Sequence, residues 1–147
     1  MKHPIPEITP AELRIMKHLW RIGDATVGDV KELLGDEGDD KPAYTTVMTM
    51  MKQLAEKGAL EVDKSRQPFV YRPAVRRDQV LTHRLLQFLH TVFDGQAGEL
   101  VARLVEEDQL SPEELKRIEA KIERSERGDD TDSTPGSKKS QGKGGKR

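Results

Sequence analysis

The chain has 147 residues, 34% hydrophobic and 35% charged, and a net charge of −1, which leaves room for one ordinary domain or a small domain with an appendage. It has no Cys, which excludes disulfides, thiolate metal sites and Cys nucleophiles. No apolar run approaches the roughly 20 residues that span a bilayer and the N-terminus has no signal-peptide core, so we expect a soluble, cytoplasmic protein without a membrane partner.

Two helices are predicted at the start of the chain. Thr9 and Glu12 have the spacing of a capping box, and helical apolar spacing continues from there until Gly23. A second, shorter helix begins at Thr26-Val27-Gly28-Asp29 and ends at Gly35. We assign no chemistry to these two helices.

The third predicted helix has two contrasting faces. It runs from about Ala43 to Lys57, and Gly58 is its left-handed stop. One side carries apolar residues for the core. The residues that lie largely on the other side are Thr45, Thr46, Met48, Thr49 and Lys52. Threonines at a helix start usually cap it, but a cap explains one Thr and not an exposed row of three.

A β-hairpin is predicted next. Leu60 and Val62 alternate before a basic, polar turn at residues 64–68, and Phe69 and Tyr71 alternate after it. Three helices and then a hairpin with a basic tip is the order of a winged helix-turn-helix. The predicted fold is therefore mainly α with a small β-hairpin, and the predicted DNA-binding domain covers residues 7–76.

A helical region is predicted over residues 77–124. From about Asp78 to Phe93 the apolar residues cover more than one helical stripe, and a short helix and a last helix from Ser111 follow. About 45 residues are too few for an independent core, so we expect an intertwined homodimer. Packing back onto the first domain is the alternative. The expected interface residues are Leu81, Leu85, Leu86, Leu89, Val92, Phe93, Leu100, Leu104, Leu115, Ile118 and Ile122.

Residues 125–147 form a Ser/Gly/Lys-rich tail without apolar residues, and we expect it to be disordered. Five positive charges in its last ten residues suggest nonspecific contact with DNA phosphates, and a simple solubilising role is the alternative.

Charge changes sign along the chain. Residues 41–77 contain eight Lys or Arg and three acids, whereas residues 79–124 contain six bases and nine acids. The first of these segments suits a polyanion and the second repels it. Ordinary scatter in a charge-rich protein is the alternative explanation.

Three stretches resemble a known family. The segment KPAYTTVMTMMKQLAEKGALEVDKSRQPFVYRP and the opening ITPAELRIMKHLW are similar to the BlaI/MecI/CopY family of penicillinase-type repressors. The resemblance continues through FDGQAGELVARLVEEDQLSPEEL and covers roughly residues 7–122. It implies a dimeric transcriptional repressor whose third helix enters the major groove of an inverted-repeat operator. It also implies that the C-terminal helices form the dimer interface and that no cofactor is needed.

The resemblance also implies roles for individual residues. By position, the base contacts are Thr45, Thr46, Met48 and Thr49. Several members of the family have Lys and Arg in place of Thr45 and Met48, so this chain is expected to read bases through hydroxyls and thymine methyls. The expected phosphate contacts are Lys41, Tyr44, Lys52, Lys64 and Arg66.

Two departures from the family concern its signal. The copper-responsive branch has a Cys-rich motif that this chain lacks. The β-lactam-responsive branch is cleaved at an Asn-Phe bond, and the matching position here is Arg103-Leu104. This bond is a candidate proteolytic site of different specificity, and a signal-activated protease is a candidate partner.

Two other classes of function were weighed. An enzyme or a metal site needs a constellation that is missing, because His83 and His90 lie about 10 Å apart along a helix, too far to share an ion. A winged helix used as a protein–protein adaptor is the stronger alternative. Such an adaptor would have a larger apolar exposed face on the third helix than this chain has.

Overall fold

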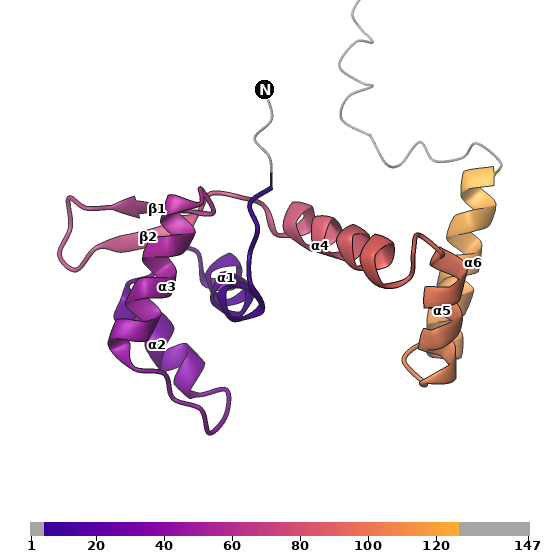
Figure 1. The fold of residues 1–147 in the computed structure, drawn as a ribbon, viewed down its shortest axis with the longest axis horizontal. Helices are drawn as coiled ribbons and strands as arrows, with labels where there is room; N and C mark the ends of the chain where they lie inside the picture. Colours follow the sequence, from indigo (N-terminus) through magenta and orange to yellow (C-terminus); the bar gives the residue numbers. More distant parts are fainter. Residues whose placement is uncertain (1–4, 127–147) are drawn as a thin grey trace, which may run out of the picture. The chain divides into compact units, whose positions relative to one another are not determined.

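The computed structural model describes residues 5–126 and confirms a mainly helical fold with one hairpin (Figure 1). By its internal contacts the chain divides into two units, Met1–Val92 and Phe93–Arg147. This division lies well beyond the boundary at residues 76–77 expected from the sequence. The difference arises because the helix that begins at Arg77 contributes Val80 to the core of the first unit.

The first two helices begin with reciprocal caps. Helix α1, Pro10–Ile22, starts after Thr9, whose hydroxyl accepts from the Glu12 N–H at 3.1 Å while the Glu12 carboxylate accepts from the Thr9 N–H at 3.0 Å. Helix α2, Val27–Gly35, repeats the arrangement with Thr26 and Asp29. Both predicted helix starts are confirmed. The sequence could predict them because a capping box is a local interaction that needs no tertiary support.

Helix α3, Tyr44–Glu56, is one residue shorter at each end than expected. Its N-cap is Ala43, which makes no side-chain cap bond, so none of the three threonines caps this helix. The helix is followed by Gly58, whose φ of +88° is the left-handed conformation that was predicted there.

The hairpin forms the wing. Strand β1, Leu60–Asp63, pairs antiparallel with β2, Val70–Pro73, so that Val62 lies opposite Tyr71. Ala25, between α1 and α2, adds a bridge to the other edge of β2. The wing is thereby hydrogen-bonded to the helical part of the unit at Tyr71.

The core of the first unit lies where α1, α2, α3 and the wing meet. The largest fully buried side chains are Ile15, Met16, Leu19, Val30, Val47, Met51, Leu54 and Val80. Val80 lies on helix α4, Arg77–Val92, which explains why this helix belongs to the first unit.

The second unit contains α5, Ala97–Glu106, and α6, Pro112–Glu126. Ser111 and Glu114 form the predicted capping box of α6. Helix α6 continues through Ser125 and Glu126, two residues into the expected tail, and residues 127–147 lie outside the described residues. Among residues 5–126, no helix is long and apolar enough to cross a membrane.

Candidate nucleic-acid interface

Three threonines form an exposed row on α3. Thr45, Thr46 and Thr49 are all exposed, and Ala43 occupies the N-cap. Within residues 5–126 none of the three hydroxyls is engaged in a side-chain hydrogen bond. Each hydroxyl therefore keeps its donor and acceptor capacity for a ligand that approaches this face.

Met48 differs from the threonines. It is partly buried and packs against the core, whereas the sequence placed it with them on the opposite side of α3. Met48 lines one cavity together with Phe69 and Tyr71 of the wing. The wing folds back beside α3, and long-range packing of this kind leaves no trace in helical periodicity.

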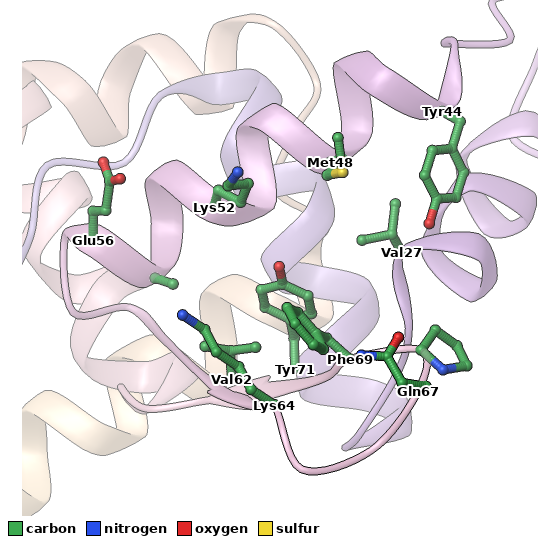
Figure 2. A pocket seen from close by; sticks show the side chains of 12 residues that line it. Val27, Tyr44, Met48, Lys52, Glu56, Val62, Lys64, Gln67, Phe69 and Tyr71 are labelled. Carbon is green, nitrogen blue, oxygen red and sulfur yellow. The ribbon is translucent and has the colours of Figure 1, made fainter.

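This cavity, which we call the wing pocket, has a volume of about 390 Å³ and lies between α3 and the hairpin (Figure 2). Its lining residues are Val27, Tyr44, Met48, Lys52, Ala55, Glu56, Val62, Lys64, Gln67, Pro68, Phe69 and Tyr71. Figure 2 shows Tyr44, Met48 and Lys52 along one wall, on α3, and Lys64 and Phe69 on the wing opposite. Three of the five expected phosphate contacts, Tyr44, Lys52 and Lys64, thus line the wing pocket.

Four basic side chains near α3 and the wing are free of ion pairs. Lys41, Lys52, Lys64 and Arg66 are exposed, and none has an acidic partner within 4.0 Å in the described part of the chain. Ammonium and guanidinium groups of this kind are available to phosphates. All four were singled out from the sequence as phosphate contacts.

Two other basic residues of the same segment are neutralised within the fold. Lys57 donates to Glu12 Oε1 at 2.6 Å, and the Arg72 guanidinium donates to both Asp24 oxygens at 3.2 and 3.3 Å. The hydrogen bond from Arg72 holds the pKa of Asp24 below its usual value. Sequence reasoning missed these pairs, since their partners lie 45 and 48 residues apart and share no local signal.

The tip of the wing is held by a local hydrogen-bonded turn. Asp63 Oδ1 accepts from the Ser65 hydroxyl at 2.6 Å and from the Ser65 N–H at 3.0 Å. These two bonds lower the pKa of Asp63 below its usual value. The turn brings the backbone of Lys64 and Arg66 to the tip, where both side chains are exposed.

Large apolar side chains are exposed on α4, in the first unit, and separately on α6, in the second unit. Leu85, Leu86, Val92, Ile118 and Ile122 are between 41% and 55% exposed. The other residues expected at a dimer interface are partly buried in the single chain: Leu81, Leu89, Phe93, Leu100, Leu104 and Leu115. Neither α5 nor α6 contains a buried residue.

The candidate proteolytic bond lies inside α5. Arg103 is exposed and approaches Glu99 and Glu106, each at 3.9 Å, on its own helix, while Leu104 is partly buried. The bond is thus in helical rather than loop backbone.

In residues 5–126 no group of three or more His, Asp or Glu side chains is placed to hold a metal ion. His83 is partly buried and His90 is exposed, both on α4.

Comparison with known proteins gives consistent matches. A family model described as penicillinase repressor matches residues 8–124. The chain is similar to the penicillinase repressor of Bacillus licheniformis, 32% identical over 114 residues that cover 78% of this chain and 88% of the relative. It is also similar to the methicillin resistance regulatory protein MecI of Staphylococcus aureus (strain N315), 26% identical over 76% of this chain and 89% of the relative.

Among solved structures, the chain is similar to monomeric Bacillus licheniformis BlaI in complex with the blaP half-operator. The identity is 32% and the TM-score is 0.43, over 51% of this chain and 89% of that one.

Proposed function

The chain belongs to the penicillinase repressor family, and from that premise we propose that it represses transcription by binding an inverted-repeat DNA operator as a homodimer. The family consists of transcriptional repressors and not of enzymes. We also propose a cytoplasmic location, because a protein that binds the operator must be in the compartment that holds the DNA.

The observation that carries the proposal is the distribution of free and paired charges. Within residues 5–126, the cations around α3 and the wing have no acidic partner within 4.0 Å and the hydroxyl row of α3 makes no side-chain hydrogen bond, whereas Lys57 and Arg72 are paired with Glu12 and Asp24. Free cations beside free hydroxyls support a polyanionic ligand whose bases are read by short side chains.

We assign the contacts accordingly. The base contacts are Thr45, Thr46, Met48 and Thr49, with Met48 offering an apolar contact to a thymine methyl from the edge of the wing pocket. The phosphate contacts are Lys41, Tyr44, Lys52, Lys64 and Arg66. The wing pocket would admit the DNA backbone between its two lysines, Lys52 and Lys64.

The dimer is supported by the exposed apolar side chains of α4 and α6. Large apolar side chains that stay about half exposed in a single chain are typical of a surface that another chain covers. A twofold dimer would present two copies of α3 to the two halves of an inverted repeat.

Release of the DNA by cleavage at Arg103-Leu104 is part of the same proposal. Proteases cut exposed, mobile backbone most readily, so cleavage would require α5 to unwind around this bond. A signal-activated protease is the corresponding partner.

The central experiment is a gel-shift titration of the full chain against DNA from upstream of its own gene. We expect a sequence-selective shift that weakens steeply with salt, with a slope that counts the phosphate contacts. Lys52→Ala and Lys64→Ala should each lower the slope by about one contact, whereas Lys17→Ala, at an exposed lysine of α1, should leave it unchanged. A shift that is independent of sequence or of salt would contradict the proposal and would favour the adaptor alternative.

A further inference from the structure

Helix α4 is anchored in the first unit at its start. Val80 is 1% exposed and belongs to the core, and Val75, just before the helix, packs against the same core. The indole of Trp20 on α1 donates to the Val75 carbonyl at 2.9 Å. The segment that leads into α4 is therefore tied to α1.

Arg84 adds a second anchor one turn after Val80. Its guanidinium donates to the backbone carbonyl of Ile8, and Ile8 is 2% exposed in the core. One turn farther, Gln87 reaches the Glu7 carboxylate at 3.4 Å. The Arg84 guanidinium and, at longer range, the Gln87 amide thus join α4 to the strap of residues 7–9 that precedes α1.

The same strap is joined to α3, the helix that we propose to contact the bases and here call the recognition helix. Lys57, the C-cap residue of α3, donates to the Glu7 carbonyl at 2.8 Å. Residues 7 and 8 therefore accept from α4 on one side and from the end of α3 on the other. Both links end on backbone carbonyls, and Ile8, which accepts from Arg84, is itself buried in the core, so the acceptor of that link is held in place by packing.

Beyond Arg84, α4 changes character. Leu85, Leu86 and Val92 are exposed and belong to the proposed dimer surface. One helix thus carries both the anchor to the DNA-binding part and a share of the contact with the second copy.

We propose that Arg84 is a positioning residue that sets the angle of α4, and through it the half-site spacing that the dimer accepts. This inference rests on the proposed function. From Arg84 to Val92 a helix advances by about 12 Å. A tilt of about 15° about Arg84 would move the far end by roughly 3 Å, close to the ~3.4 Å between successive base pairs.

The experiment measures spacing preference separately from half-site affinity. The wild-type chain, Arg84→Ala and Arg84→Lys are titrated against one half-site and against inverted repeats whose spacer is native, or longer or shorter by one and two base pairs. Sedimentation gives the dimer constant of each protein. Arg124→Ala, at an exposed arginine of α6, is the matched control.

We expect wild type and Arg124→Ala to favour the native spacing by about tenfold or more. Arg84→Ala should accept spacers longer or shorter by one base pair within about threefold of the native spacer, with unchanged half-site affinity and dimer constant. Arg84→Lys, which can still donate to the Ile8 carbonyl, should restore most of the preference.

Three results would overturn the inference. One is an unchanged spacing preference in Arg84→Ala. Another is a loss of half-site affinity in parallel with thermal stability, which would indicate a merely structural role. The third is an Arg84→Lys protein that folds but behaves like Arg84→Ala. If the wild-type chain binds no half-site selectively, the proposed function itself fails, and this outcome is distinct from the other three.

Discussion

The threonines of α3 are short side chains on a helix whose N-cap position is held by an alanine. Because Ala43 offers no capping side chain, the backbone N–H groups in the first turn of α3, near Thr45 and Thr46, have no side-chain cap and can donate to a ligand. Donors at a helix N-terminus favour a phosphate, while hydroxyls reach base edges only at close range. The face is therefore suited to a close approach by DNA rather than to long-range contacts.

Thr46→Ala should relax sequence preference at one operator position. Loss of one hydroxyl contact removes discrimination against the wrong base at that position, by about 1–3 kcal/mol where the contact is well formed. Binding to a library of single-base operator variants measures this change. Unaltered discrimination at every position would mean that Thr46 does not contact a base.

Arg66→Ala should act differently, because Arg66 has no ion-pair partner in the described part of the chain and is exposed at the wing tip. We expect affinity to fall nearly uniformly over the same library, with a salt slope lower by about one. A change confined to particular base pairs would assign Arg66 to base reading instead.

Glu12 is a residue whose role is entirely inside the fold. Its burial by itself raises the pKa, but the hydrogen bonds from Lys57 and from the Thr9 N–H, together with the positive charge of Lys57, outweigh burial and hold the pKa of Glu12 below its usual value of 4.5. A carboxylate whose pKa is lower in the folded state than in the unfolded state stabilises the folded protein. Its full contribution is present at pH values above the pKa of the unfolded state. This contribution disappears as the pH falls through the folded pKa.

Glu12→Gln should therefore lower the free energy of unfolding by about 1–3 kcal/mol at pH 7, because the Lys57 ammonium loses its charged partner. The difference from wild type should shrink as the pH is lowered below about 4.5. Urea denaturation at several pH values measures both effects. Glu32→Gln, at an exposed carboxylate of α2, should stay within about 0.5 kcal/mol of wild type.

At the scale of elements, the turn between α3 and β1 places the wing beside the recognition helix. Gly58 follows α3 with a φ of +88°, and Ala59 and Leu60 are buried directly after it. The Ala59 N–H donates to the Leu54 carbonyl at 2.9 Å, which closes the end of α3. The backbone must therefore turn sharply at one residue.

Gly58→Ala should destabilise the chain by about 1–2 kcal/mol, although an added Cβ would meet nothing within 4 Å. The cost is one of backbone conformation and not of space. Gly38→Ala is the matched control, since Gly38 also has open space around it and lies outside the left-handed region. Thermal unfolding of the two variants separates the effects, and equal melting temperatures would contradict this account.

The elements show which local signals are reliable. The capping boxes at Thr9, Thr26 and Ser111 predicted three helix starts, because each is completed within three residues. The start of α3 carries no such box, and its N-cap is Ala43 rather than a threonine. Helix α4 was predicted within one residue at each end, but its apolar pattern did not indicate that Val80 belongs to the core of the first unit.

At the scale of the whole molecule, the second unit has helices without a buried interior. Isolated helices of this length are marginal in water unless an apolar face is covered. The proposed homodimer would supply that cover for α6, whose Ile118 and Ile122 are exposed in the single chain.

Ile118→Glu should shift the chain towards the monomer, with at least tenfold weaker association measured by sedimentation equilibrium. The operator affinity should fall in parallel, because two half-sites are then no longer bound together. Lys121→Glu introduces the same side chain at an exposed polar position of α6 and should leave association within about threefold. Equal association by the two variants would remove α6 from the interface.

Local sequence signals were sufficient for the capped helix starts and for the hairpin with its basic turn. These depend on neighbours within a few residues or on periodicity along one element. The wing pocket around Met48, the neutralisation of Lys57 and Arg72, and the attachment of α4 through Arg84 depended on the folded chain. Each joins residues at least about 20 positions apart, and packing energy between such residues has no periodic signature along the sequence.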